Sequence, residues 1–237
     1  MQLFYHPDFS KSPFDLPEDE SKHMIRVLRK QEGDSLLLID GKGHEAKGVL
    51  MKANPKKCSI AIEKILFHAK TLPYHLHIAI APTKQFERMD WFIEKAIEIG
   101  IDEISFIETQ NSERDKINLE RCQKIAISAI KQSKQYWLPQ INPIQKFNDF
   151  IKHHNTSDTC KLIAWCPEDP SHTLVNRLNQ SASKNIICLI GPEGDFTEAE
   201  LKLAKENQYL PVSLGSNILR TETAGVYVCV AAGLGRM

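Results

Sequence analysis

The chain has 237 residues, with 30 Lys and Arg against 30 Asp and Glu, 42% hydrophobic and 25% charged residues. These values are close to those of globular proteins, so they exclude an intrinsically disordered chain and a low-complexity fibre. The length fits one large domain or two modest ones. Because the formal net charge is zero, any nucleic-acid binding has to depend on a local basic patch and not on bulk charge.

The sequence predicts a cytoplasmic protein that is neither inserted in a membrane nor bound to a metal. No apolar run reaches the roughly 18 residues of a membrane span, and residues 1–14 lack the basic and apolar regions of a secretory signal. None of the six cysteines forms a Cys-x-x-Cys pair and most lie in apolar segments, which indicates buried reduced thiols. His153 and His154 have no partner motif, so we expect no metal there.

Residues 1–72 form the first predicted domain. Acidic residues come early and basic residues late in the segment 17–31, which favours a helix. Short apolar runs at 35–40, 44–53 and 58–66 follow, separated by turn residues, and they predict strands of a small antiparallel barrel.

Residues 73–237 form the second predicted domain, with the boundary placed at 70–74. Near-continuous apolar strands alternate with helices in this region, which predicts an α/β fold with a parallel sheet covered on both faces. The predicted strands span 76–82, 103–109, 161–165, 186–190 and 212–215, and the predicted helices span 86–100, 119–137, 197–207 and 221–233.

The basic side chains Lys22, Arg26, Arg29 and Lys30 are spaced so that they share one face of the predicted helix 17–31. Two interpretations remain open. The cluster is either a solvated helix face or a surface that follows the phosphates of a nucleic acid.

A glycine-containing loop follows the buried strand 186–190. It reads Gly191-Pro192-Glu193-Gly194, and Thr197 with Glu200 then forms a capping box that opens a helix. Ligands of open α/β sheets bind at the carboxyl ends of strands, and glycine allows a ligand to approach the backbone. The loop lacks the Gly-Lys-Ser/Thr of a phosphate cradle, so it suits an uncharged or cationic ligand better than a triphosphate. An ordinary tight turn is the alternative.

A second strand end carries Gly215, then Arg220, Glu222 and Thr223, directly before an almost wholly apolar helix. Charged residues at such a junction are poorly explained by packing. A helix that is apolar on every side has to be buried, either in the core or in a subunit interface.

These two segments, IGPEGDFTEAE at 190–200 and LGSNILRTETA at 214–224, resemble the signatures of the RsmE family, the 16S ribosomal RNA uridine-N3 methyltransferases of the SPOUT class. The resemblance continues through the rest of the chain. HMIRVLR at 23–29, MDWFIEKAIEIGI at 89–101, SERDKI at 112–117 and AIKQSKQYWLP at 129–139 are each similar to a family motif in the same order.

The resemblance implies a PUA-like RNA-binding barrel followed by a SPOUT domain whose C-terminal chain forms a trefoil knot. It further implies S-adenosyl-L-methionine as cofactor, 16S rRNA or the small ribosomal subunit as partner, and a homodimer. The cofactor-binding residues that carry over are Ile190, Gly191, Pro192, Glu193, Gly194, Leu214, Gly215, Ile218, Leu219, Arg220, Glu222, Thr223 and Ala224.

We assign catalytic roles as hypotheses on the same resemblance. Arg220 would stabilise the uracil anion, and Glu222 would act as base or orient the base. Arg114 would be a second cation that reaches the partner subunit's site, with a surface salt bridge to Glu113 or Asp115 as the alternative. The RNA-binding residues would be His23, Arg26, Arg29 and Lys30.

The sequence departs from the family pattern at Asp195, Asn217, Lys131 and Gln135. The first departure affects loop geometry, and the others bear on phosphate contacts. Alternative functions are an RNA-binding module without catalysis, a SPOUT methyltransferase with another RNA target, and a nicotinamide enzyme. The Gly-x-Gly-x-x-Gly fingerprint of a nicotinamide enzyme is absent from this sequence.

Overall fold

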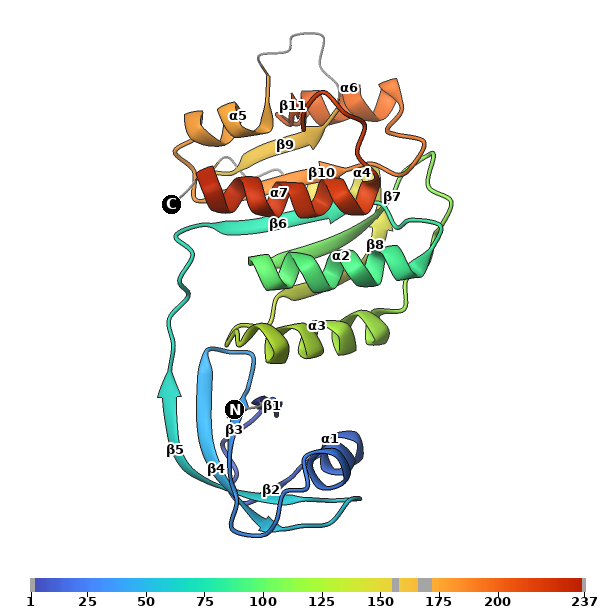
Figure 1. Ribbon diagram of the computed structural model, residues 1–237. Helices are drawn as coiled ribbons and strands as arrows, with labels where there is room; N and C mark the ends of the chain where they lie inside the picture. Colours follow the sequence, from blue (N-terminus) through green and yellow to red (C-terminus); the bar gives the residue numbers. More distant parts are fainter. Residues whose placement is uncertain (1–2, 155–157, 166–171, 236–237) are drawn as a thin grey trace. The chain divides into compact units, whose positions relative to one another are not determined.

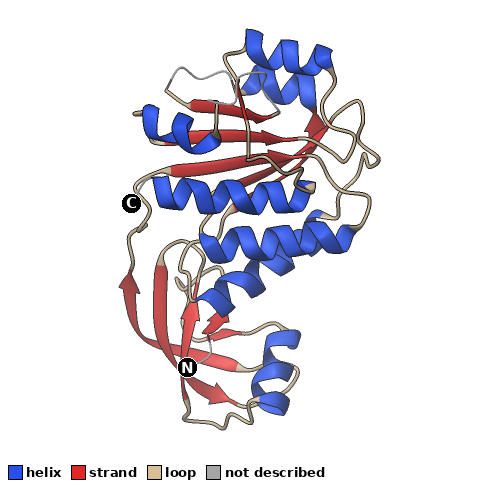
Figure 2. Cartoon of the chain, turned by 45° about the horizontal axis from the view of Figure 1, so that its top comes forward, coloured by secondary structure: helices blue, strands red, loops and turns tan. Residues whose placement is uncertain are grey.

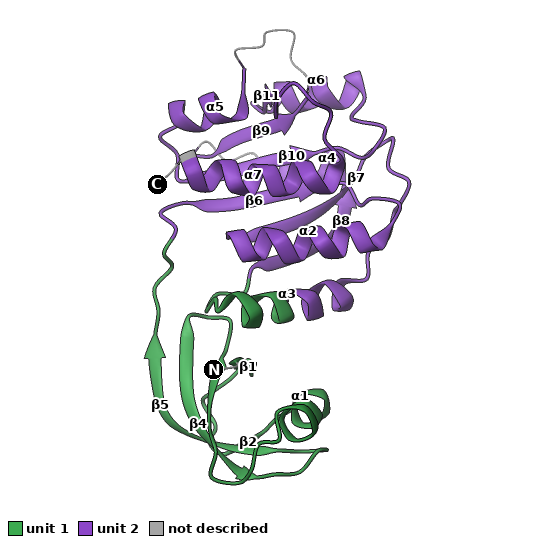
Figure 3. Ribbon diagram, in the orientation of Figure 1, with its two compact units in different colours: residues 1–71, 127–138 green, residues 72–126, 139–237 purple. Residues whose placement is uncertain are grey.

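A computed structural model of the chain describes residues 3–154, 158–165 and 172–235. The chain divides into two compact units (Figure 3). The first unit contains Met1–Thr71 together with Ile127–Leu138, and the second contains Leu72–Ala126 and Pro139–Met237. The first unit is therefore assembled from two separate stretches of chain.

The first unit is built on a curled five-stranded sheet with the order β1-β3-β4-β5-β2. Its strands are β1 (Leu3–Tyr5), β2 (Phe14–Asp15), β3 (Ser35–Ile39), β4 (His44–Lys52) and β5 (Ser59–Phe67). Only the β1–β3 pair is parallel. Phe4, Met24, Leu38 and Ile60 are buried in a common core, as the small barrel predicted from the sequence requires.

The predicted helix over 17–31 is wrong in its C-terminal part. The chain forms α1 (Glu18–Lys22), which continues as a turn of π-helix, η1 (His23–Val27). Arg29 then adopts a left-handed backbone with φ of 54°, so the helix ends before Arg29 and Lys30. The basic residues consequently do not share one face of a regular α-helix, and spacing counted in α-helical turns does not apply to them.

The segment 127–138 pairs with the sheet of the first unit. The Gly43 N–H donates to the Tyr136 carbonyl over 2.9 Å, and the Leu138 N–H donates to the Gly41 carbonyl over 2.9 Å. A Cβ on Gly43 would lie 2.6 Å from the Trp137 ring, so glycine is required for this approach. The predicted helix 119–137 accordingly stops early, as α3 (Leu119–Ser133), where Lys134 turns left-handed.

The second unit contains a six-stranded parallel sheet with the order β11-β9-β10-β6-β7-β8 (Figure 1). Its strands are β6 (His75–Ile80), β7 (Glu103–Glu108), β8 (Gln140–Lys146), β9 (Cys160–Ala164), β10 (Asn185–Ile190) and β11 (Leu210–Val212). The carboxyl ends of β9, β10 and β11 lie side by side, because these strands are parallel neighbours in the order β11-β9-β10.

Helices cover both faces of this sheet (Figure 2), as predicted. The helices α2 (Phe86–Ile99), α5 (Leu174–Gln180) and α7 (Thr221–Gly235) pack together over one face. The helices α4 (Phe147–His153) and α6 (Glu198–Glu206) pack over the other face, where Phe150 and Leu201 join Ala79 and Leu189 in one core. No helix among residues that the structure describes is long and apolar enough to cross a membrane.

Candidate functional site

A cavity of about 530 Å³ opens at the carboxyl ends of β9, β10 and β11. It is bounded by the loop that follows β10 and by the loop that connects β11 to α7. Its lining residues are Arg88, Ala164, Trp165, Ile190, Gly191, Pro192, Glu193, Asp195, Val212, Leu214, Gly215, Asn217, Ile218, Leu219, Arg220, Thr221 and Ala224.

The loop after β10 is held in a tight turn. The Asp195 N–H donates to the Pro192 carbonyl over 3.0 Å. The Asn111 side-chain amide donates to the Gly194 and Asp195 carbonyls at 2.9 and 3.0 Å. The capping box of Thr197 and Glu200 is present and fixes the start of α6. The backbone of Gly191 and Pro192 is thereby presented to the cavity on a rigid support.

The loop after β11 meets the first loop through a hydrogen bond. The Thr221 hydroxyl, at the start of α7, donates to the Gly191 carbonyl over 3.0 Å. Gly215 has a φ of 132°, a conformation that side-chain-bearing residues rarely adopt. Ile218 is 99% exposed beside the cavity, so an apolar side chain there is free to pack on a bound molecule.

Three charged side chains meet at the edge of the cavity. Arg88, in the first turns of α2, lies 3.8 Å from Glu222 (Nε to Oε1) and 4.0 Å from Glu193 (Nη1 to Oε1). Glu222 is 7% exposed, and its Oε2 atom is buried without a hydrogen-bond partner in the described part of the chain. An unpaired buried acceptor is costly, so this carboxylate is suited to a donor that arrives with a ligand.

A second cavity, of about 590 Å³, lies next to the first. Arg88, Ile218, Leu219 and Arg220 line both cavities, and Glu87, Trp91, Glu222 and Thr223 line only the second. The charged groups of Arg88 and Arg220 therefore stand between two spaces, which suits a reaction between two bound molecules.

Comparison with known proteins identifies the chain's family. Residues 70–233 match the model of an RNA methyltransferase domain, and residues 16–63 match that of an RNA methyltransferase PUA domain. A ribosomal RNA small subunit methyltransferase E from Bacillus subtilis is 29% identical over 92% of this chain and 88% of its own length. The chain belongs to the ribosomal RNA small subunit methyltransferase E family.

Solved structures agree with this membership. A probable rRNA-methyltransferase from Porphyromonas gingivalis is 39% identical, with a TM-score of 0.90 over 100% of this chain and 98% of that chain. Ribosomal RNA small subunit methyltransferase E from Neisseria gonorrhoeae, solved bound to S-adenosyl methionine, is 27% identical, with a TM-score of 0.86 over 99% and 97% of the two chains.

All but two of the catalytic and cofactor-binding residues named from the sequence line one of the two cavities. Gly194 lines neither and instead accepts the Asn111 hydrogen bond. Arg114 also lines neither. Its Nε donates to the Lys84 carbonyl over 2.7 Å and its guanidinium lies 3.9 Å from the centre of the Phe86 ring. Glu113 pairs instead with Lys84, at 2.9 Å.

Sequence reasoning missed Arg88 and Trp165, which line the first cavity. Arg88 follows the predicted strand 76–82 and lies near the start of the next helix, which places it at the same sheet edge as the loop 191–194. That strand-to-helix position was the available signal. Trp165 directly follows β9, so the same rule would have selected it.

The departures from the family pattern have local explanations in two cases. Asp195 has a φ of 59°, and aspartate tolerates this left-handed conformation better than most residues. Lys131 forms an ion pair with Glu20 inside the first unit. Asn217 lines the cavity, and nothing in the structure explains the change at Gln135.

The predicted RNA-binding residues lie on the first unit. Arg26 and Arg29 are exposed, and neither makes an ion pair with any residue in the described part of the chain. Lys30 donates to the Ser35 carbonyl over 3.3 Å. His23 lines a cavity of about 590 Å³ within this unit, together with Leu3, Asp19, Glu20, Ser128, Lys131, Gln132 and Lys134.

Proposed function

We propose that this protein transfers the methyl group of S-adenosyl-L-methionine to N3 of one uridine in 16S rRNA. The observation that carries the proposal is the cavity at the ends of β9, β10 and β11, formed by the two loops whose sequences match the family. The S-adenosyl methionine-bound relative from Neisseria gonorrhoeae supports the same cofactor.

The residues present fit this cofactor. The volume of about 530 Å³ is in the range of small-molecule sites. Ile218 and Trp165 provide apolar surface, and Glu222 Oε2 is an unpaired acceptor at the edge. When bound, the cofactor supplies an electrophilic methyl group. We propose that it is held by Ile190, Gly191, Pro192, Glu193, Gly194, Leu214, Gly215, Ile218, Leu219, Arg220, Glu222, Thr223 and Ala224.

The chain's own contribution is to position uracil and to assist loss of the N3 proton. Orientation of two reactants accounts for up to roughly 7–11 kcal/mol of a barrier, and a general base for about 10²–10⁴-fold in rate. We propose that Arg220 stabilises the uracil anion. Glu222, held close to Arg88, acts as the base or orients it.

Residues 1–72 act, in this proposal, as the PUA-like RNA-binding domain, and residues 73–237 as the SPOUT methyltransferase domain. Arg26 and Arg29 contact RNA phosphates, with His23 and Lys30 beside them. The lack of competing ion pairs at the two arginines within the described residues supports this role. A base inside folded RNA has to leave its stack to reach the cavity.

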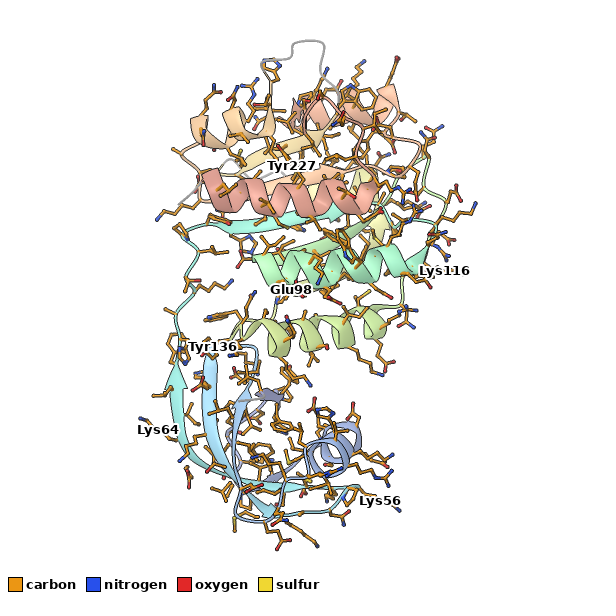
Figure 4. The ribbon with its side chains drawn as sticks, viewed as in Figure 1. Lys56, Lys64, Glu98, Lys116, Tyr136 and Tyr227 are labelled. Carbon is orange, nitrogen blue, oxygen red and sulfur yellow. The ribbon has the colours of Figure 1, made fainter. Side chains whose placement is uncertain are left out.

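We also propose the family's trefoil knot, a homodimer and a cytoplasmic location. The hydrogen bond from Thr221 to Gly191 and the packing of α7 on β6 and β10 support a C-terminal segment threaded past the β10 loop. Tyr227 on α7 (Figure 4), Val230 and Leu234 are 37%, 40% and 69% exposed, which supports a partner on this helix. Arg114 would then contribute to the partner subunit's site.

The decisive test uses small ribosomal subunits from cells that lack this gene. Incubation with purified protein and S-adenosyl-L-methionine is expected to add one methyl group to one uridine, located at N3 by mass mapping of the 16S rRNA. The variant Arg220→Ala should abolish the transfer, and Lys202→Ala on α6 serves as the matched control. Full methylation by Arg220→Ala would refute its assigned role.

The same experiment separates the alternatives. An RNA-binding module without catalysis would bind the subunit and add no methyl group. A methyltransferase with another target would modify a different RNA. Calorimetry with S-adenosylhomocysteine and with NAD distinguishes both from a nicotinamide enzyme, since only the latter binds NAD.

A further inference from the structure

A cluster of imidazole groups lies at the end of the second unit's sheet opposite the cavity. His75 and His77 begin β6, and Glu103 begins β7. His154 follows directly after α4, the helix that packs over β7 and β8. The amino ends of parallel strands meet at one edge of a sheet, so side chains far apart in sequence are brought together there.

Three potential ligand atoms, from His77, Glu103 and His154, lie close to one another, and His75 lies close to Glu103. Glu103 Oε2 lies 3.7 Å from His77 Nδ1 and 3.9 Å from His75 Nε2. One ligand atom from each of His77, Glu103 and His154 lies within 4.8 Å of the other two. These separations exceed a hydrogen bond. Two ligands about 2.0–2.1 Å from one tetrahedral ion lie roughly 3.3 Å apart, so the His77, Glu103 and His154 atoms would have to move closer together to share one ion.

The outward-facing atoms of the same side chains are already engaged. His77 Nε2 lies 2.8 Å from Ser105 Oγ, and His154 Nδ1 lies 3.0 Å from the Phe150 carbonyl. Asn142 donates to Glu103 Oε1 at 2.6 Å and to Ser105 Oγ at 2.9 Å. With Nε2–H of His77 and Nδ1–H of His154 as donors, the lone pairs of His77 Nδ1 and His154 Nε2 are left for a ligand.

This second layer of contacts is the arrangement that orients histidine and carboxylate ligands around metals. His77 is only 2% exposed, whereas His75 and Glu103 have partly exposed side chains. The cluster thus has a buried ligand on a strand and an open side through which an ion can enter.

We propose that His75, His77, Glu103 and His154 form a binding site for a divalent transition metal of the zinc type. Imidazole nitrogen with carboxylate oxygen is a donor set that suits zinc, and it does not suit calcium or magnesium. The ion would join the starts of β6 and β7 to the end of α4. It lies at the opposite edge of the sheet from the cofactor cavity and takes no part in methyl transfer.

Cobalt(II) is a direct probe, because its visible absorption reports coordination by imidazole. Full-length, tag-free protein titrated with Co²⁺ is expected to develop tetrahedral absorption bands that saturate at one ion per chain and disappear on addition of Zn²⁺. His154→Ala should weaken binding at least tenfold. His153→Ala, which removes the exposed neighbouring imidazole, should bind like the unaltered chain.

Equal binding by the His153→Ala and His154→Ala proteins would overturn the proposal, as would saturation at no defined stoichiometry. If circular dichroism shows that His154→Ala is unfolded, His75→Ala replaces it, since that side chain is 43% exposed. The readout needs neither RNA nor S-adenosyl-L-methionine, so its result is independent of the methyl-transfer proposal.

Discussion

Arg88 connects two carboxylates of the candidate site through its guanidinium group. It lies within 4.0 Å of both Glu193 and Glu222, so its guanidinium balances two carboxylates. Loss of this cation would leave the buried Glu222 with no ion-pair partner among the described residues.

We predict that Arg88→Ala lowers the turnover of methylation by about tenfold to a thousandfold, and that Arg88→Lys recovers part of it. Single-turnover kinetics at several pH values provides the measurement. If Arg88 positions Glu222, the pH dependence of the methylation rate should differ between Arg88→Ala and the unaltered protein. Arg121→Ala, on α3, removes a surface ion pair with Asp90, which shares α2 with Arg88. It is the control and should leave both values unchanged.

The cysteines give a second prediction at this scale. Burial raises the pKa of the Cys122 thiol to about 11, and it also raises the pKa values of Cys188 and Cys229. At pH 8 only about one Cys122 thiol in a thousand would be ionised, and the thiolate is the reactive form. Cys58 and Cys160 are buried as well. Native Cys166→Ser protein should therefore react with a thiol reagent only very slowly, and all five remaining cysteines should react after denaturation. Rapid modification of the native protein would contradict this.

At the scale of elements, α7 packs against α2 through a glycine. A Cβ on Gly225 would lie 2.4 Å from Phe92 Cε2, whereas a Cβ on Gly233 would meet nothing closer than the Tyr74 hydroxyl, at 3.7 Å. The two positions are in the same helix, so they differ in packing and not in secondary structure.

We predict that Gly225→Ala lowers the free energy of unfolding by about 1–3 kcal/mol through overpacking. Gly233→Ala should leave it unchanged or raise it by up to about 1 kcal/mol, because alanine is the better helix former. Denaturant unfolding followed by circular dichroism measures both. A similar loss in the two variants would mean that the contact with Phe92 is not the cause.

The sequence predicted the parallel sheet and its covering helices because long apolar strands and amphipathic helices leave a strong periodic pattern. It did not predict β8, α4 or α5. The strand β8 contains Pro143 and polar residues, and it lies at the edge of the sheet, where neither alternation nor continuous hydrophobicity is required. The end of η1 also escaped prediction, because the left-handed conformation of Arg29 has no local signal in its residue type.

The candidate site likewise contains residues that sequence motifs select and contacts that only the packing of distant elements creates. Gly191 and Arg220 are in loops that follow apolar strands, and Glu222 is in the first turn of α7, so their motifs and positions were sufficient to select them. The Arg88 contact with Glu222 depends on the packing of α2 beside α7, and the meeting of His77 with His154 depends on α4. Contacts between elements distant in sequence leave no spacing pattern to detect.

At the scale of the whole molecule, the proposed function divides RNA capture and methyl transfer between the two units. We predict that Arg26→Glu with Arg29→Glu weakens rRNA binding and lowers the dependence of log affinity on log salt concentration by about two, the number of phosphate contacts removed. S-adenosylhomocysteine binding should not change. Filter binding and calorimetry measure the two quantities.

Lys202→Glu with Lys205→Glu, a matched double reversal on α6, is the control and should alter neither property. A parallel loss of RNA and S-adenosylhomocysteine binding in the Arg26 and Arg29 variant would argue against this division.

The dual origin of the first unit has a consequence for biosynthesis. The Gly41 carbonyl and the Gly43 N–H pair with Leu138 and Tyr136, which leave the ribosome long after the N-terminal strands have been translated. The turn between β3 and β4 therefore lacks these two partners as it emerges, and a fragment ending at residue 72 would lack them permanently. A first unit expressed on its own would therefore need residues 127–138 joined to residues 1–72 in one chain.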